Sequence, residues 1–335
     1  MTTTVPNSES DAVTVGAAPP FDPELAAALD VIRERMPETL TADMLPLLRQ
    51  AQAQAADMTE LGLDGAFTVS DRVVPGPAGE PDISLAVYVP AKATTPVAAI
   101  YFIHGGGMIM GNNRGASIAG ALNVAAELGL AVISVEYRLA PEHPHPAPVE
   151  DCYAGLLWTV EHADDLGIDP ERLVVAGTSA GGGLAAATVL LARDRSGPAI
   201  TAQVLWSPML DDRNNSYSAR QMVGLGIWDA NYNEFGWTAL LGDQQGGSDV
   251  SPYAAPARAS DLSGLPPAFV DVGSAETFRD EAVEYASRIW RAGGSAELHV
   301  WPGGFHGFQL LAPQAAISQT SQQAVVPWLR RTIGI

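Results

Sequence analysis

The chain has 335 residues, of which 47% are hydrophobic and 17% are charged, and its formal net charge at pH 7 is −20. This length suits one large α/β domain with insertions or two ordinary domains, and the apolar content excludes a globally disordered chain. The acidic balance repels phosphate backbones and anionic membranes, so we expect neither nucleic acid nor a membrane among the partners of this protein.

Residues 1–20 are rich in Thr, Ser, Pro and Asp and contain no Lys or Arg. We predict a disordered leader here, and not a signal peptide, because the segment has no positive start and no continuous apolar core. The longest apolar stretches of the chain are too short for a transmembrane helix. The simplest location of the protein is therefore the cytoplasm, and its single cysteine, Cys152, excludes an internal disulfide.

Residues 21–62 form a second segment, in which apolar residues such as Leu25 and Leu29 recur at helical spacing. Pro37 and Pro46 are expected to break this segment into short helices. The spacing fits a cap over a functional site and a helical pair packed elsewhere equally well, because both arrangements bury the same apolar stripe.

The rest of the chain alternates between strand-like and helix-like segments. Residues 67–74 and 83–89 alternate partially at period two on either side of Pro-Gly turn residues, which predicts an antiparallel pair. Six further apolar runs are separated by helix-like segments and predict βαβ units. These runs cover residues 97–103, 131–135, 173–176, 202–206, 268–272 and 297–301. The predicted fold class is therefore α/β, with about eight strands in a mostly parallel sheet and helices on both faces.

A glycine-rich motif, H-G-G-G at residues 104–107, follows the first of these apolar runs. Three consecutive glycines leave backbone N–H groups uncovered and allow a substrate oxygen to approach closely. Acyl transfer through a serine forms a tetrahedral oxyanion, which needs such fixed donors. We predict that Gly105, Gly106 and Gly107 contribute to an oxyanion hole, as loops of this type do in lipases and esterases.

A second motif, G-T-S-A-G at residues 177–181, lies between an apolar run and a series of small residues that can enter a helix. A strand, G-x-S-x-G and a helix together are typical of a nucleophile elbow, whose tight turn holds the serine hydroxyl clear of the sheet. We predict that Ser179 is a nucleophile and that the backbone N–H of Ala180 is a further oxyanion donor.

Residues 212–258 interrupt the alternation of strands and helices and contain several aromatic residues among Gly and Asn. We interpret this segment as a second contribution to a cap. Its aromatic side chains either line an acyl or alcohol pocket or attach the cap to the body. They are Tyr217, Trp228, Tyr232, Phe235 and Trp237.

His306 lies in the motif G-G-F-H-G-F at residues 303–308, in a loop after the last strand-like run. Its place after Ser179 in the chain fits the order Ser, acid, His of a hydrolase triad. We predict that His306 is the general base and acid of the site.

These motifs resemble those of the hormone-sensitive lipase family of α/β hydrolases, the bacterial family IV esterases. The resemblance runs from about Phe67 to the C-terminus and includes Y-R-L-A-P-E at residues 137–142 and S-P-M-L-D at residues 207–211. Thr178 stands where many members have aspartate, which places the chain nearer the GTSAG branch than the GDSAG branch. The resemblance implies an α/β-hydrolase catalytic domain at residues 63–335, with a helical cap that includes residues 21–62 and 212–258.

The third member of the triad is an acid that the family pattern D-x-L-x-D-E locates. The corresponding stretch here runs from Ser274 to Glu281, and Glu276 matches the position of the family's catalytic aspartate. A glutamate can orient the imidazole and stabilise its protonated form, and Glu276 follows an apolar strand-like run. Asp280 is the alternative, although it is better explained as an acid in the first turn of a helix.

The resemblance implies a serine carboxylesterase that hydrolyses short- to medium-chain acyl esters of small molecules through an acyl-enzyme intermediate. An amidase, a lactonase or an acyl transferase with the same triad is one alternative, and a non-catalytic small-molecule receptor is another. Neither a cofactor nor a metal is expected, since His143 and His145 lie in a Pro-rich turn without partnering Cys. Members of the family often dimerise through an edge strand, so a homodimer is a further expectation.

Overall fold

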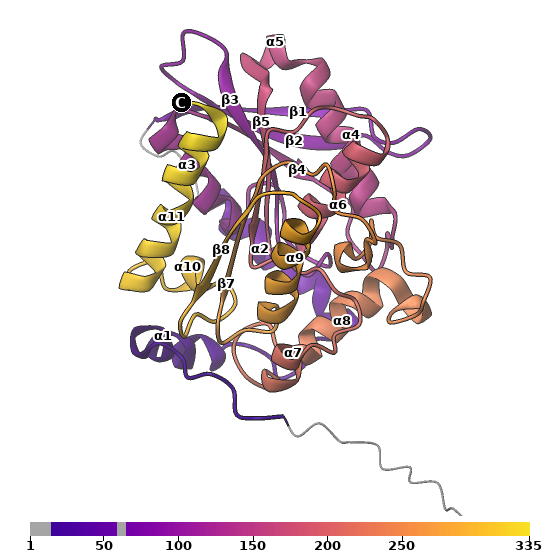
Figure 1. Ribbon diagram of the computed structural model, residues 1–335, viewed down its shortest axis with the longest axis vertical. Coiled ribbons are helices and arrows are strands. Elements are labelled where there is room, and N and C mark those ends of the chain that lie inside the picture. The colour runs from indigo at the N-terminus through magenta and orange to yellow at the C-terminus, as the bar shows by residue number, and fades with distance from the viewer. Residues whose placement is uncertain (1–14, 59–64) are drawn as a thin grey trace, which may run out of the picture.

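A computed structural model describes residues 15–58 and 65–335 (Figure 1). In these residues eight strands form one sheet in the order β1-β2-β4-β3-β5-β6-β7-β8. The strands are β1 (Phe67–Val74), β2 (Ile83–Pro90), β3 (Val97–Ile103), β4 (Ala131–Glu136), β5 (Ile168–Thr178), β6 (Ala202–Trp206), β7 (Ala268–Gly273) and β8 (Ala296–Trp301). β2 is antiparallel to both β1 and β4, and the remaining pairs are parallel, which confirms the predicted fold class.

Helices cover both faces of this sheet (Figure 1). α3 (Ala119–Leu128) and α11 (Ala316–Ile333) pack on one face over a core that includes Phe102 and Phe269. On the other face lie α4 (Ala147–Glu161), α6 (Ala180–Asp194) and α9 (Arg279–Arg291), whose core includes Tyr101. Adjacent residues of β3 thus face opposite layers, and both are buried, as in a central parallel strand.

Further helices connect and extend these layers. They are α5 (Ala163–Leu166), α7 (Tyr217–Gln221), α8 (Ala230–Leu241) and α10 (Phe308–Leu311), with 3₁₀ turns at Ala42–Met44, Ala116–Ile118, Gly242–Gln244 and Pro256–Arg258.

The N-terminal segment contains α1 (Pro23–Arg33) and α2 (Leu45–Met58). Pro37 lies between the two helices, whereas Pro46 lies in the first turn of α2. Proline is tolerated there, because the first N–H groups of a helix have no intrahelical partner. Our expectation that Pro46 breaks a helix was therefore wrong. Residues 1–14 of the predicted leader, which was assigned to residues 1–20, lie outside the described part of the chain.

α1 packs against residues 305–315, which are far from it in the sequence. Leu25 and Leu29 share a buried cluster with Phe305 and Phe308, which flank the loop of His306. The backbone N–H of Asp22 donates to the carbonyl of Gly303 at 3.1 Å. The first and last parts of the described chain therefore meet beside the candidate site.

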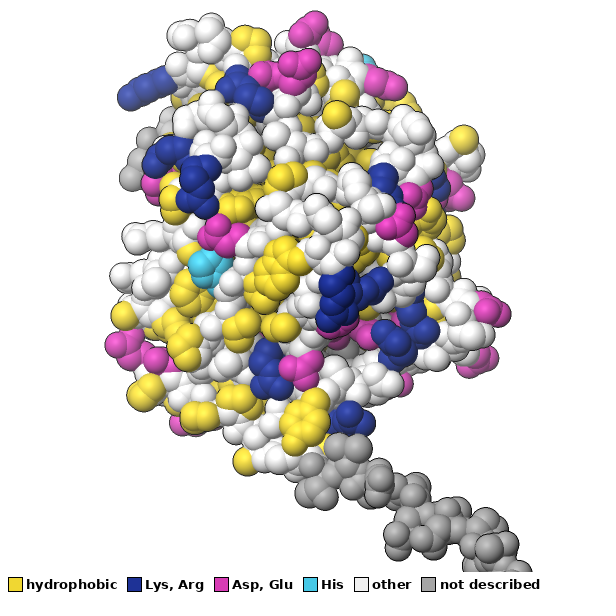
Figure 2. Space-filling model, viewed as in Figure 1, with side chains coloured by type: hydrophobic (Ala, Val, Ile, Leu, Met, Phe, Trp, Pro, Cys, Tyr) yellow, Lys and Arg dark blue, Asp and Glu magenta, His cyan; other side chains and the backbone are white. Residues whose placement is uncertain are grey.

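The surface seen in Figure 2 mixes charges of both signs with apolar side chains. Basic side chains on this face lie among acidic ones. Within the described ranges, no helix has both the length and the apolar composition needed to cross a bilayer.

Candidate functional site

Ser179 occupies a strained turn between β5 and α6. Its backbone has φ 59° and ψ −122°, a conformation that is costly for a residue with a side chain. The flanking glycines make the turn possible, since a Cβ on Gly177 would overlap the carbonyl of Gly181, and a Cβ on Gly181 would overlap that of Ile103. The N–H of Ser179 donates to the carbonyl of Trp206 at 2.8 Å, which ties the turn to the neighbouring strand.

The structure brings Ser179, His306 and Glu276 together from three separate loops. The Nε2 atom of His306 lies 2.9 Å from the Oγ of Ser179, and its Nδ1 lies 3.2 Å from the Oε1 of Glu276. All three side chains are buried. The ring of Phe278 stands edge-on to the imidazole at 5.0 Å, which adds a packing contact to the two hydrogen bonds.

Glu276 is held by its second oxygen. Oε2 accepts from the hydroxyl of Ser207 and from the N–H of Gly273, each at 3.0 Å. These two donors leave Oε1 to face His306. Sequence reasoning did not identify Ser207 as a partner of this acid, although its position directly after β6, at the carboxyl edge of a parallel sheet, could have suggested it.

Asp280, the alternative acid, lies in the first turn of α9 as expected. Its carboxylate accepts from the N–H of Ser218 at 2.7 Å and pairs with Arg279 at 2.8 Å. No hydrogen bond joins it to His306 in the part of the chain that the structure describes. Asp280 therefore fixes the start of α9 against α7.

The glycine loop follows β3 and lies against the elbow. A Cβ on Gly105 would lie 2.8 Å from the carbonyl oxygen of Thr178, so this backbone approaches Ser179 more closely than a larger residue allows. Gly106 and Gly107 have φ values of 117° and 62°, which favour glycine. Ala180 begins α6, whose first N–H groups have no intrahelical partner and carry the positive end of the helix dipole.

His104 supports this loop from beneath. The imidazole is buried, stacks on Tyr137 at 4.1 Å between ring centroids, and lies with Nδ1 2.9 Å from the carbonyl of Gly105. Burial lowers the pKa of His104 to about 4, so the ring is neutral at pH 7 and its Nδ1–H donates to that carbonyl. The hydroxyl of Tyr137 donates to the carbonyl of His104 at 2.9 Å.

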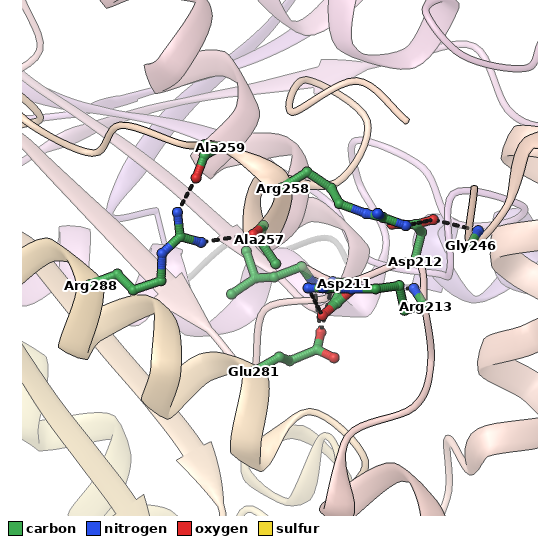
Figure 3. A network of polar contacts seen from close by, with 10 residues as sticks. Asp211, Asp212, Arg213, Gly246, Ala257, Arg258, Ala259, Glu281 and Arg288 are labelled. Carbon is green, nitrogen blue, oxygen red and sulfur yellow. Dashed lines mark hydrogen bonds and ion pairs between the residues drawn. The ribbon is translucent and has the colours of Figure 1, made fainter. Parts of the chain in front are cut away.

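A buried polar network fixes the loop after β6 that carries Ser207 (Figure 3). Glu281 of α9 accepts from the N–H groups of Leu210 at 2.6 Å and Asp211 at 3.3 Å. Burial raises the pKa of Glu281 well above its usual range. Asp212 pairs with Arg258 at 2.7 Å, and neither side chain is exposed by more than 14%. The loop is thus held from two sides.

The aromatic residues between 212 and 258 serve different purposes. The ring of Trp228 fills the space that a Cβ on Gly107 would enter, so it lies over the glycine loop. Tyr232 donates its hydroxyl to the carbonyl of Pro37, and Trp237 is fully buried in the main core. Trp228 therefore packs on the glycine loop, whereas Tyr232 joins the two segments that were predicted to form a cap.

Among the described residues, no group of three or more His, Cys, Asp and Glu side chains is arranged to hold a metal ion.

Comparison with known proteins gives consistent matches. A family model described as the α/β-hydrolase fold matches residues 100–310. The carboxylesterase NlhH of Mycobacterium tuberculosis is 36% identical over 311 residues, which cover 90% of this chain and 93% of that protein. Among solved structures, a bacterial heroin esterase is 40% identical with a TM-score of 0.86 and covers 93% of this chain and 98% of its own. Esterase LipW from Mycobacterium marinum is 34% identical with a TM-score of 0.82 and covers 94% of this chain and 98% of its own.

Proposed function

Since this chain belongs to the hormone-sensitive lipase family of α/β hydrolases and is a carboxylic ester hydrolase, we propose that it cleaves short- to medium-chain esters through an acyl-enzyme on Ser179. The observation that carries this proposal is the pair of contacts at His306, 2.9 Å to the Oγ of Ser179 and 3.2 Å to Glu276. A serine is a weak nucleophile until a base within hydrogen-bond reach takes its proton.

In the first half of the reaction, the Oγ of Ser179 attacks the ester carbonyl while the Nε2 of His306 takes the hydroxyl proton. Glu276 keeps the Nδ1–H of the ring in place and stabilises the imidazolium that forms. The C–O bond to the alcohol then breaks, and the Nε2–H protonates the leaving alkoxide. The acyl group remains on Ser179 as an ester.

In the second half, water replaces the alcohol. His306 removes a proton from the water, the hydroxide attacks the acyl carbon, and the Ser179 oxygen leaves with that proton. The products are one carboxylic acid and one alcohol, and the enzyme returns to its starting state. No cofactor enters this balance.

The oxyanion of both tetrahedral intermediates would lie against N–H groups of Gly105, Gly106, Gly107 and Ala180. Two observations support this assignment: the backbone of Gly105 packs against Thr178 at the elbow, and α6 starts at Ala180, whose N–H has no intrahelical partner. A single donor of this kind is worth roughly 3 to 4 kcal/mol of transition-state stabilisation.

The size of the acyl group would be limited by the segments above the site. Trp228 lies over the glycine loop, and Tyr232 ties its segment to Pro37. Each buried methylene adds about 0.8 kcal/mol until the pocket is full, so kcat/KM should rise over the first few carbons and then fall.

A panel of p-nitrophenyl esters from acetate to palmitate tests the proposal, with Ser179→Ala as the control. We expect Ser179→Ala to lower kcat by roughly 10⁶ with the fold retained. Covalent labelling by an organophosphate should disappear with the same change. Undiminished labelling of the variant would contradict the nucleophile, whereas faster cleavage of palmitate than butyrate would contradict the limit on chain length.

Two finer expectations from the sequence also belong to this proposal. A cytoplasmic location is consistent with the low cysteine content, because the single Cys152 is buried and unpaired. A homodimer would form through an edge strand of the sheet, and light scattering on the purified chain distinguishes it from a monomer.

A further inference from the structure

Two side chains of α2 bind the backbone that leaves the glycine loop. This stretch, residues 108–111, is the loop exit. The Nε of Arg49 donates to the carbonyl of Ile109 at 2.8 Å. The Oε1 of Gln52 accepts from the N–H of Gly111, also at 2.8 Å. Arg49 and Gln52 are three positions apart, so they lie on the same face of the helix and hold the loop exit at two points.

Each of these two contacts reaches a proposed oxyanion donor through one further step. The N–H of Ile109 donates to the carbonyl of Gly106 at 3.1 Å, so the residue that Arg49 holds is bonded to one donor residue. Gly111 lies so close to Gly105 that a Cβ on Gly111 would be 2.4 Å from the carbonyl oxygen of Gly105. A displacement of the loop exit would therefore move the peptide groups of Gly105 and Gly106.

The loop exit begins with a residue whose backbone needs support from outside. Met108 has φ 62°, and such a conformation in a residue with a side chain persists only where the surroundings hold it. The carbonyl of Met108 accepts from the N–H of Ala140 at 2.9 Å. The carbonyl of Ala140 in turn accepts from the Nη2 of Arg49 at 2.8 Å. One guanidinium thus holds both the loop exit and the segment bonded to its first residue.

Glu142 orients this guanidinium. The Nη1 and Nη2 of Arg49 donate to the two carboxylate oxygens of Glu142 at 2.9 and 2.8 Å. Glu142 is more than half exposed, so the ion pair adds little free energy of its own, but its two parallel hydrogen bonds fix the plane of the guanidinium. Arg49 therefore bonds Ile109, Ala140 and Glu142 at once, which the ammonium of a lysine, a compact point charge, does not reproduce.

We propose that Arg49 is a positioning residue for the oxyanion hole, so that α2 supports the chemical step as well as the shape of the pocket. This inference rests on the proposed acyl-enzyme mechanism. Oxyanion donors must be fixed before the transition state forms, and a displacement of about 1 Å can cost roughly 10²-fold in rate. Loss of Arg49 should therefore lower kcat for every ester by the same factor, whereas a change in pocket shape would alter the preference for chain length.

The first experiment compares two arginines of the N-terminal segment. Arg49→Met removes the hydrogen bonds and keeps an unbranched side chain. Arg33→Met is the matched control, because Arg33 lies in α1 and donates to the carbonyl of Gly224 at 2.7 Å, away from the loop exit. We expect Arg49→Met to lower kcat by roughly 10- to 100-fold for acetate, butyrate and hexanoate esters alike, with KM within about threefold of the parent. Arg33→Met should keep kcat within about twofold.

Both variants are compared per active site, after titration with an organophosphate, so that inactive protein does not count. Equal kcat in Arg49→Met and Arg33→Met would overturn the proposal. A loss confined to one chain length would also overturn it, because that result means a change in the pocket and not in the oxyanion hole.

A tetrahedral analogue separates positioning from stability. Phenylboronic acid forms a tetrahedral adduct with a nucleophilic serine, and one oxygen of the adduct takes the place of the oxyanion, so its Ki reports on the donors. The Ki should rise in Arg49→Met by about the factor by which kcat falls. A lower melting temperature with an unchanged Ki would mean that Arg49 acts on stability alone, and would overturn the proposal.

Gln52 provides a second test in case Arg49→Met does not fold. Gln52→Met removes the acceptor of the Gly111 N–H, whereas Gln52→Glu keeps an oxygen there. We expect kcat to fall several-fold in Gln52→Met and to stay near the parent value in Gln52→Glu. Equal kcat in these two variants would overturn the proposal.

Hydrogen exchange of residues 105–111 tests the support of the loop without any turnover, and so separates this inference from the proposed function. Exchange should be faster in Gln52→Met than in Gln52→Glu, because the loop exit has lost one of its two contacts with α2. Equal exchange rates would overturn this inference, whereas a parent chain that cleaves no ester would contradict the proposed function.

Discussion

Replacing Glu276 by glutamine should abolish most of the activity through the tautomer of His306. Oε2 of Glu276 accepts from Ser207 and from the N–H of Gly273, and a backbone N–H can only donate. The amide oxygen of a glutamine must therefore take the place of Oε2, which turns its NH₂ group toward the Nδ1 of His306. An NH₂ donor there forces the ring proton onto Nε2, so His306 can no longer accept the proton of Ser179. We expect a loss of about 10⁴ in kcat, or about 5.4 kcal/mol.

Asp280→Asn is the matched control, because it makes the same change of acid to amide one helical turn away. The asparagine oxygen can still accept from Ser218, and the lost pair with Arg279 is partly exposed and worth at most about 1 kcal/mol. We expect kcat within roughly threefold of the parent. Steady-state kinetics and urea unfolding of both variants separate activity from stability. A larger loss of kcat in Asp280→Asn than in Glu276→Gln would refute this reasoning.

Three further predictions concern residues around the site. Gly107→Ala should lower kcat by roughly 10²-fold or more, because the new Cβ overlaps the ring of Trp228 and displaces proposed oxyanion donors, and unchanged kinetics would contradict it. Burial raises the pKa of Asp271 to about 7 in the folded protein. Ionisation of this carboxyl therefore lowers the free energy of unfolding as the pH rises from 4 to 7. Asp271→Asn should therefore gain unfolding free energy relative to the parent over this range, up to about 4 kcal/mol, and a gain that does not vary with pH would argue otherwise. Burial lowers the pKa of His104 to about 4, so the neutral ring stabilises the folded state above pH 6.5. This part of the unfolding free energy, up to about 3 kcal/mol, is lost as the pH falls toward 4. An NMR titration in which His104 titrates near pH 6.5 would exclude this cause.

The strands could be predicted because each is an apolar run with clear ends. Residues 97–103 and 202–206 were predicted with the bounds that the structure has. β5 begins at Ile168, earlier than the apolar run at 173–176, because the strand also includes residues 169–172, which are three charged residues and a proline. These four residues carry no periodic hydrophobic signal, since each of them is half-buried or exposed.

Residues of the candidate site could be predicted only where a short local motif indicates their chemistry. Ser179 and the glycine loop each lie in a short pattern with its own steric reason, and the structure places the Oγ of Ser179 2.9 Å from the Nε2 of His306. The contact between Ser207 and Glu276 joins residues 69 positions apart, and no local pattern encodes it. The contacts of Arg49 and Gln52 with the loop exit were also missed, because they join residues 60 and 59 positions apart.

The position of α1 has a consequence for how the protein is made. Leu25 and Leu29 find their packing partners in Phe305 and Phe308, and Asp22 bonds to Gly303. A ribosome adds about 5 to 20 residues per second, so α1 leaves the tunnel on the order of tens of seconds before its partners are synthesised. During that interval its apolar face is uncovered, while βαβ units of the body can already assemble. Docking of α1 against the loop of His306 therefore has to follow the synthesis of residues 303–308, and the surroundings of His306 are completed only after that step.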